Sequence, residues 1–413
     1  MTGGVAPLNA PATNISQSLP DHYRDHSVSV IFHPPRPVAK KLYLVAGEAS
    51  GDYRGAELMR ALRKYDPDLE FLGAGGREML ALGGAHFMDW ADEAVVGLWD
   101  VLKKYGYFKA QFDRMLADIA LVQPDALILI DYPGFNLRLA KAVKAKQPHI
   151  RIIDYISPQV WAWNRGRIPK MARYLDLMLC IFPFEKPLYE KSGLRTVFVG
   201  HPILDSLTAK RIEDSRDPNL VGLFPGSREK EVRRIFPVMV EAAQRMRDEQ
   251  PGLRFEASAA SHQLADMMLA ILQRHGENEE FCAVSVRSSH ELMQRSAVGL
   301  VCSGTATLEA AFFGLPFSVI YKIAWLTWVV GKRLVRVPFL GMPNVLAGRE
   351  IARELLQGAA TPTALAEETL RLLRDDRVRE TLQSELETVV KNLGAPGAAR
   401  RAAEAIIEEL NRP

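Results

Sequence analysis

Cysteine is scarce in this sequence: there are three among 413 residues, Cys180, Cys282 and Cys302. They lie far apart, each in or beside an apolar run, and their spacing fits neither a disulfide framework nor a zinc site. Because Cys packs as a small hydrophobe, we expect three buried free thiols in a reducing compartment.

Long apolar runs are also missing. No stretch reaches the roughly 18 apolar residues that crossing a bilayer requires, and Asp21, Arg24 and Asp25 interrupt the region where a secretory signal would have its apolar core. We therefore expect no export and at most peripheral membrane contact. A net charge of +3 over this length is too small for a nucleic-acid footprint, so no nucleic-acid partner is expected.

The remaining sequence is typical of a globular protein, with 48% hydrophobic residues. Residues 1–40 lack periodicity and are rich in Pro, Asn, Ser and His, which predicts a flexible extension. Beyond them, short apolar runs alternate with helical patterns, which predicts parallel sheets covered on both faces. The predicted strands are 42–46, 126–130, 151–155, 177–181 and 196–199, then 220–224, 254–257, 283–286, 298–302 and 317–321.

The strand pattern restarts after a polar segment at 210–218, which predicts an α/β protein with two Rossmann-like doubly wound domains facing across a cleft. We place the first domain at 41–205, the second at 206–375, and C-terminal helices packing across both at 376–413. Ligands of such sheets bind at the carboxyl ends of the strands, so candidate residues are sought there.

The turn after the first predicted strand reads Gly47-Glu48-Ala49-Ser50-Gly51-Asp52. An ordinary strand-to-helix turn explains the glycines, and Ser50 or Asp52 can cap the following helix. It does not explain Glu48, a carboxylate at the edge of the predicted cleft. We therefore expect Glu48 to take part in the chemistry, with Ser50, Gly51 and Asp52 contacting substrate.

Asp131 follows the predicted strand 126–130 and is the leading candidate for a general base on a sugar hydroxyl. The alternative is that Asp131 caps the next helix. Asn136 is the better predicted cap, because it immediately precedes the helical residues Leu137 and Leu139.

Two helix starts in the second half suit phosphate groups. The first predicted strand there leads into Gly226, Ser227 and Arg228, where free backbone N–H groups and a guanidinium can bind a diphosphate. The loop is not a Walker A motif, because it lacks the GK[ST] ending. The second start supplies small and hydroxylated residues followed by an acid for ribose hydroxyls: Ser303, Gly304, Thr305, Thr307 and Glu309. Either start alone can be ordinary capping, but two together favour a nucleotide site.

Further along, Asn344 and Glu350 precede another helical segment and are expected to face the cleft. The sequence has no DxD-like acid pair at a strand end, so no metal or other cofactor is expected. A helix dipole and an arginine are enough to stabilise a departing diphosphate.

Two aromatic and basic stretches suggest contact with an anionic membrane surface, although core packing explains either one about equally well. One is 325–336. The other contains the residues predicted to touch lipid: Val96, Leu98, Trp99, Leu102, Lys103 and Lys104.

Taken together, these segments resemble the lipid-A-disaccharide synthase family, which has the inverting glycosyltransferase B fold. The similarity covers about residues 41–360 and consists of motifs in the same order: GEASGD, IDYPGFN, YISPQVWAW, FPFE, VGHP, PGSRxxE, SGTATLE and PNVLAGRE. By this resemblance Glu48, Asp131, Arg228 and Asn344 match active-site positions, and the SGTATLE residues match those that hold the uridine nucleotide. Gly134 stands where some relatives carry a second acid.

The resemblance implies a reaction between UDP-2,3-diacylglucosamine, the donor, and 2,3-diacylglucosamine 1-phosphate, the acceptor. The products are a β-1,6-linked lipid A disaccharide phosphate and UDP. It implies peripheral association with the cytoplasmic face of a bacterial inner membrane, and it leaves a homodimer open. Alternatives are a UDP-N-acetylglucosamine 2-epimerase, a transferase acting on an undecaprenyl-linked sugar, or a non-catalytic adaptor that binds UDP-sugars.

Overall fold

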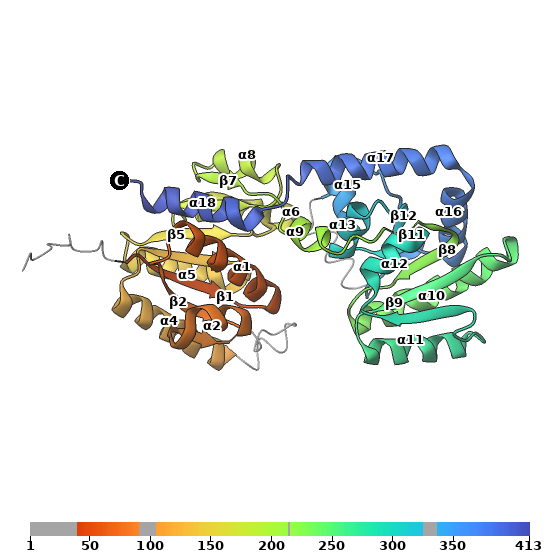
Figure 1. The fold of residues 1–413 in the computed structure, drawn as a ribbon, viewed down its shortest axis with the longest axis horizontal. Helices are drawn as coiled ribbons and strands as arrows, with labels where there is room; N and C mark the ends of the chain where they lie inside the picture. The colour runs from red at the N-terminus through yellow and green to blue at the C-terminus, as the bar shows by residue number, and fades with distance from the viewer. Residues whose placement is uncertain (1–38, 91–104, 214, 325–336) are drawn as a thin grey trace, which may run out of the picture. The chain divides into compact units, whose positions relative to one another are not determined.

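The computed structural model describes residues 39–90, 105–213, 215–324 and 337–413, which form two parallel sheets (Figure 1). The first sheet has the order β3-β2-β1-β4-β5-β6-β7. Its strands are β1 (Lys41–Ala46), β2 (Glu70–Gly75), β3 (Phe87–Asp89), β4 (Ala126–Ile130), β5 (Arg151–Tyr155), β6 (Leu177–Cys180) and β7 (Thr196–Phe198).

The second sheet has the order β10-β9-β8-β11-β12-β13. Its strands are β8 (Asp217–Phe224), β9 (Arg254–Ala259), β10 (Cys282–Val286), β11 (Ser296–Cys302), β12 (Phe317–Tyr321) and β13 (Glu354–Leu356). In each sheet the first strand lies inside, so the strand order reverses between β1 and β4 and between β8 and β11. Such switch points leave a crevice at the carboxyl ends of the strands.

Burial on both faces explains why the strands are continuously apolar. Along β1, Leu42 and Leu44 pack into one cluster of buried side chains while Tyr43 and Val45 pack into another. The helices that cover the first sheet are α1 (Ala49–Tyr65), α2 (Arg77–Gly83), α4 (Tyr105–Val122), α5 (Pro133–Lys146), α6 (Val160–Trp163), α7 (Ile168–Met171), α8 (Glu185–Glu190) and α9 (Ile203–Thr208).

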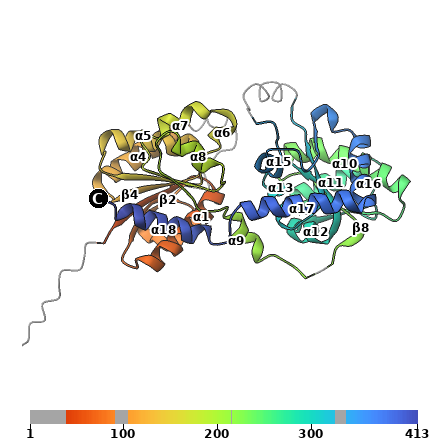
Figure 2. The same ribbon diagram turned by 90° about the horizontal axis from the view of Figure 1, so that it is seen from above.

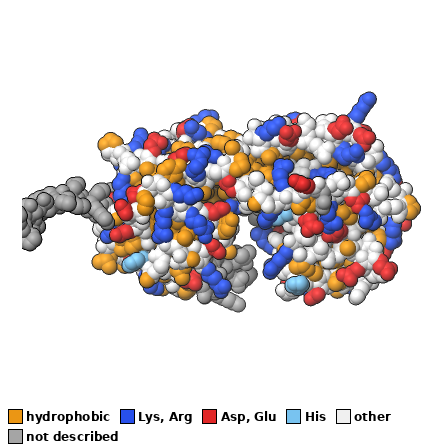
Figure 3. Space-filling model, in the orientation of Figure 1, with side chains coloured by type: hydrophobic (Ala, Val, Ile, Leu, Met, Phe, Trp, Pro, Cys, Tyr) orange, Lys and Arg blue, Asp and Glu red, His pale blue; other side chains and the backbone are white. Residues whose placement is uncertain are grey.

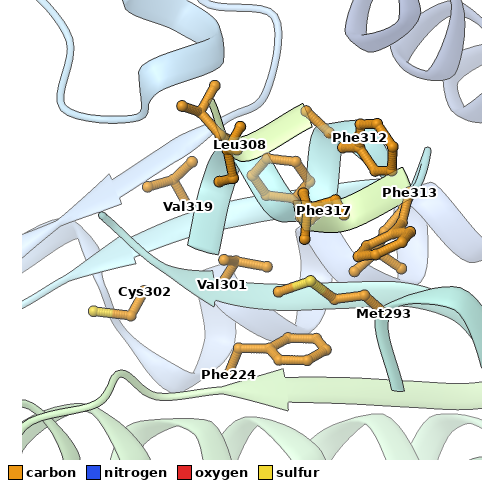
Figure 4. Packing of buried hydrophobic residues seen from close by; sticks show 14 of the residues in the cluster. Phe224, Met293, Val301, Cys302, Leu308, Phe312, Phe313, Phe317 and Val319 are labelled. Carbon is orange, nitrogen blue, oxygen red and sulfur yellow. The ribbon is translucent and has the colours of Figure 1, made fainter. Parts of the chain in front are cut away.

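The second sheet is covered in the same way. Figure 4 shows Phe224 and Val301 from neighbouring strands packed near Phe317 and beneath Leu308 and Phe312 of a covering helix. The covering helices are α10 (Glu229–Glu249), α11 (His262–Arg274), α12 (Ser289–Arg295), α13 (Thr305–Phe312) and α15 (Met342–Ala347). Over the face shown in Figure 3, Lys and Arg side chains are interspersed with Asp and Glu.

The C-terminal segment forms three helices: α16 (Pro362–Arg374), α17 (Asp376–Asn392) and α18 (Ala398–Leu410). Helix α16 packs on α10 and α17 packs on α13, both in the second half, whereas α18 packs on α1 in the first (Figures 1 and 2). Asp205 accepts hydrogen bonds from the backbone N–H groups of Gly397 and Ala398 at the start of α18. The chain end is thereby attached to the first sheet's helices.

The structure confirms the predicted α/β class, and every predicted strand is present. Three short or glycine-rich strands were missed: β2, β3 and β13. The three cysteines are buried and free, as expected. Within the described ranges, no helix is both long and apolar enough to span a membrane.

Glu409 provides a test of how α18 is held. Its nearly buried carboxylate receives hydrogen bonds from Arg151 (3.0 Å) and Arg195 (2.8 Å) of the first sheet. We expect Glu409→Ala to lower the free energy of unfolding by about 2–3 kcal/mol, because both guanidinium groups lose their buried acceptor and keep more exposed partners such as Glu408 and Arg412 O. Glu387→Ala, which removes an exposed pair with Lys391 on α17, should leave the free energy of unfolding unchanged within experimental error. Urea unfolding measures both, and equal effects would contradict this account of α18.

Candidate active site

A pocket of about 320 Å³ lies at the carboxyl ends of β8, β9 and β11, where α10 and α13 begin. The predicted residues Gly226, Ser227, Arg228, Ser303, Gly304, Thr305 and Glu309 all line it. Gly226 and Gly304 have φ angles of 110° and 148°, a backbone conformation that side chains with a Cβ rarely adopt. Backbone N–H groups at helix starts suit a phosphate-bearing ligand.

Glu231 holds the predicted phosphate-binding arginine. Its carboxylate accepts hydrogen bonds from Arg228 N (3.3 Å) and from Arg228 Nη1 (3.0 Å) in a capping box at the start of α10. The Glu231 side chain is largely buried, whereas that of Arg228 is 70% exposed. Glu231 therefore fixes the backbone of the loop, and the Arg228 guanidinium remains accessible from the pocket.

Three polar pocket residues besides Glu231 were missed by the sequence analysis: Ser258, Arg287 and Ser289. Ser258 is the last residue but one of β9, Arg287 follows β10, and Ser289 begins α12. Arg287 has φ of 58°, and its backbone N–H donates to Ala259 O. Ser258 and Arg287 directly follow the predicted strands 254–257 and 283–286, and this position was the signal in the sequence that could have identified them.

Thr307 does not line the pocket, contrary to its predicted contact with nucleotide. Its side chain is fully buried; the hydroxyl donates to Gly304 O (2.8 Å) and accepts from Met342 N (3.3 Å). Ser303 similarly donates to Leu340 O (2.9 Å), although Ser303 also lines the pocket. These hydroxyls tie the start of α13 to the segment before α15.

Asn344 is also turned into the protein rather than toward a cleft. Its amide accepts from Ile351 N (2.8 Å) and Ala352 N, and donates to Ala352 O and to the Glu354 carboxylate (2.9 Å). The expectation that this side chain faces the cleft is therefore wrong, because every polar atom of the buried amide is engaged inside. The geometry makes Asn344 a support for the 340–354 loop.

Glu350 is not brought together with the other predicted residues. It accepts from Glu354 N (2.8 Å) and lines a separate pocket with Arg353 and Arg371. Its predicted place facing the cleft is not where the structure puts it.

In the first half, the turn before α1 divides into exposed and buried residues. Glu48 and Ser50 are exposed, whereas Gly51 packs against Ala46 and Ile130. Asp52 is buried and accepts from the N–H groups of Gly76 (2.8 Å), Glu78 (2.9 Å) and Met79 (3.0 Å). The prediction that Asp52 can cap its own helix is thus wrong, because it caps the start of α2, and its contact with substrate stays a prediction.

Asp131 stands at the end of β4 in a left-handed conformation, with φ of 51°, and Tyr132 follows with φ of 48°. Such strain requires surrounding bonds to maintain it. Asn136 supplies one, because its Nδ2 donates to Asp131 O (2.7 Å) and Ile130 O (3.3 Å). Asn136 is therefore not the predicted cap, since α5 already begins at Pro133.

The acids around Asp131 all titrate above their usual range. Burial raises the pKa of Asp131. Partial burial, followed by the negative charge of Asp131, raises the pKa of Glu48, and the positive charge of Arg228 partly opposes this rise. Burial, followed by the charges of Asp131 and Glu185, raises the pKa of Asp154 well above normal. A base with a raised pKa is better matched to proton transfer near neutral pH.

A second pocket, also of about 320 Å³, contains residues from both halves of the chain. Ser50, Arg54 and Asp131 line it together with Thr305 and Glu309, which also line the first pocket. The Asp131 carboxylate therefore shares a cavity with residues at the start of α13, the predicted phosphate-binding helix start. This arrangement suits transfer to a hydroxyl with departure of a phosphate leaving group.

The comparisons with known proteins agree with this chemistry. A family model for lipid-A-disaccharide synthetase matches residues 42–408. The chain belongs to this family. The lipid-A-disaccharide synthase of Trichlorobacter lovleyi is 42% identical over 385 residues, covering 90% of this chain and 98% of that protein. That of Geobacter metallireducens is 40% identical with the same coverage. The chain is thus a glycosyltransferase of lipid A biosynthesis.

Solved structures show the fold in more distant proteins. A UDP-N-acetylglucosamine 2-epimerase from Neisseria meningitidis, bound to UDP-GlcNAc, has a TM-score of 0.57 at 11% identity, over 90% of this chain and 99% of that one. The calicheamicin glycosyltransferase CalG4 has a TM-score of 0.55 at 11% identity, over 91% and 99%. Both likenesses show that the chain has the glycosyltransferase B architecture.

The residues predicted to touch a membrane lie outside the described residues: Val96, Leu98, Trp99, Leu102, Lys103, Lys104 and segment 325–336. In the part of the chain that is described, no three His, Cys, Asp or Glu side chains are grouped so as to hold a metal ion.

Glu185 provides a test of the buried electrostatics near Asp131. Its carboxylate accepts from Trp161 Nε1 (2.8 Å) and Phe182 N (3.0 Å), and burial raises its pKa from 4.5 to about 7. The native state therefore binds more protons than the unfolded state between these values. The contribution of Glu185 to the free energy of unfolding should be complete below about pH 4.5. It should fall by about 3 kcal/mol as the pH rises through 7.

Glu185→Gln should lack this fall, because its amide cannot ionise. Denaturant unfolding of wild type and variant at several pH values gives the difference directly. Glu190→Gln, on the exposed side of the same helix, is the control and should retain the fall. A wild type and a Glu185→Gln variant with parallel profiles would show that Glu185 ionises normally.

Proposed function

We propose that the chain transfers diacylglucosamine from UDP-2,3-diacylglucosamine to the 6-hydroxyl of 2,3-diacylglucosamine 1-phosphate, with inversion. Asp131 takes the hydroxyl proton as the oxygen forms a bond to the donor's anomeric carbon, and the bond from that carbon to the diphosphate breaks. The products are the β-1,6-linked disaccharide phosphate and UDP.

The observation that carries this proposal is the shared lining of the two pockets. Thr305 and Glu309 border both the pocket with Arg228 and the pocket with Asp131. A diphosphate at the helix starts would therefore place its sugar toward the base. The glycosyltransferase B fold is known with a UDP-sugar bound in the Neisseria epimerase, which supports a UDP-sugar in the corresponding half here.

The acylated substrates of such a reaction are amphiphiles, which supports a reaction that takes place at a lipid surface. We propose peripheral association with the cytoplasmic face of the inner membrane. The two aromatic and basic stretches of the sequence, 95–109 and 325–336, are the proposed contacts.

The deciding experiment measures UDP release by the purified chain in detergent micelles, with the diacylated donor and with or without the acylated sugar phosphate. Release that depends on acceptor, with formation of a disaccharide phosphate, is the expected result. Release or epimerisation with UDP-N-acetylglucosamine alone would favour an epimerase-like activity, and donor binding without release would favour an adaptor.

Asp131→Asn tests the base. We expect kcat to fall by a factor of about 10²–10⁴, the usual range for loss of a positioned base, while UDP binding stays within about twofold. Asp266→Asn, an exposed change on α11, should leave both unchanged. Loss of UDP binding in Asp131→Asn would instead give Asp131 a structural role.

The pH dependence provides a separate test of Asp131. Because burial raises its pKa, wild-type kcat/KM should fall with decreasing pH at a midpoint above the ordinary Asp value of 3.8. Initial rates between pH 4 and 9 measure this midpoint. A rate that stays constant down to pH 4 would contradict the raised pKa.

A further inference from the structure

His201 lies between β7 and α9, in the VGHP segment to which the proposed chemistry gives no role. Several contacts fix its ring. Its backbone N–H donates to Leu393 O (3.0 Å), its Nδ1 accepts from Ile203 N (3.1 Å), and its ring packs on Phe182 with centroids 5.2 Å apart.

The contact with Ile203 determines which ring nitrogen carries the proton. A backbone N–H can only donate, so Nδ1 must be the unprotonated nitrogen and the neutral ring must carry its hydrogen on Nε2. Burial, followed by the charge of Arg54, lowers the pKa of His201 to about 3. At physiological pH the ring is therefore a neutral donor with a fixed tautomer.

The protein supplies no acceptor for this donor. Among the described residues Nε2 has no hydrogen-bond partner, and His201 lines the pocket that also contains Asp131. Because Nε2 is not fully buried, a molecule that enters the pocket can accept a hydrogen bond from it.

The other groups facing this pocket do not take up the donor. Aliphatic side chains of Ile156, Ile181 and Ile203 form the wall beside it. Arg54 is paired with Glu57 (2.8 Å), and Lys210 Nζ lies 3.2 Å from His290 Nδ1, with Glu309 on the opposite side of His290 (3.5 Å). Each of these charged groups thus has its own partner, while Asp131 and His201 line the same cavity.

We propose that His201 is a substrate-binding residue whose Nε2–H donates a hydrogen bond to an oxygen atom of the acceptor sugar. This inference rests on the proposed function, in which Asp131 removes the proton of an acceptor hydroxyl. A donor in the same cavity orients the acceptor so that this hydroxyl reaches Asp131. The imidazole holds the sugar and exchanges no proton.

Two substitutions at His201 test the roles of the two ring nitrogens separately. His201→Asn keeps an acceptor at the Nδ1 position for Ile203 N, but its NH2 group lies near the position of Cδ2 and places no donor at the position of Nε2. His201→Gln keeps a donor at about the position of Nε2. We expect His201→Asn to raise the acceptor KM about tenfold or more with the donor KM and the Tm unchanged, and His201→Gln to restore most of the acceptor affinity.

Direct titration of the acceptor into each protein in detergent micelles gives a readout that does not need turnover. If the wild type binds acceptor but releases no UDP, the proposed function fails while the comparison of acceptor affinities still decides the role of His201. His262→Asn, at the exposed start of α11, is the control and should bind acceptor like the wild type.

Acceptor analogues that lack the phosphate or one acyl carbonyl identify the oxygen. The analogue without the bonded oxygen should bind wild type and His201→Asn equally. Unchanged acceptor affinity in His201→Asn would overturn the proposal, and so would an equal loss in both variants. A wild-type to His201→Asn ratio that changes with a midpoint near pH 6.5 would overturn it too, because the ring would then be titrating.

Discussion

The burial of both faces of each parallel sheet is the constraint on which the site depends. Strands such as β4 and β11 carry side chains that are packed on both sides, so only residues near their carboxyl ends, such as Cys302, can meet a ligand. Polar residues with a chemical role must follow the strands, where the chain turns into a helix. Asp131 after β4 and Ser303 after β11 occupy such positions.

Buried polar contacts then hold these turns in place. Asn136 binds the carbonyl oxygens of Ile130 and Asp131, and Asp52 fixes the start of α2. In the second half, Thr307 binds the first residue of α15 and Asn344 binds the segment that follows this helix. Their bonds are made inside the protein, where an unsatisfied partner is expensive, so each turn has one stable geometry. The left-handed conformation of Asp131 is maintained by such support.

The sequence was sufficient to predict most of the fold, because strands buried on both faces leave a clear apolar signal. It was insufficient for β2, whose Gly73 packs against the backbone of Leu44, and for the three-residue edge strands β3 and β13. At the site, residue type and position after a strand identified Asp131, Arg228 and Glu309. They did not show which polar side chains turn inward, because the partners of Asp52 and Asn344 are mostly backbone groups, which no pattern in the sequence reveals.

The surroundings of Asp131 explain how a carboxylate can serve as a base in this cavity. A strong cation beside it would lower its pKa and weaken it as a base, whereas burial raises that pKa. The neighbouring Asp154 avoids adding a second negative charge, because its own burial favours the protonated form. His201, held neutral by burial, offers a hydrogen-bond donor without a positive charge. Arg228, Arg287 and the helix starts supply positive groups where the diphosphate is expected. In the cavity that contains Asp131, Arg54 and Lys210 lie beside Glu57 and His290, and neither cation offsets the effect of burial on the pKa of Asp131.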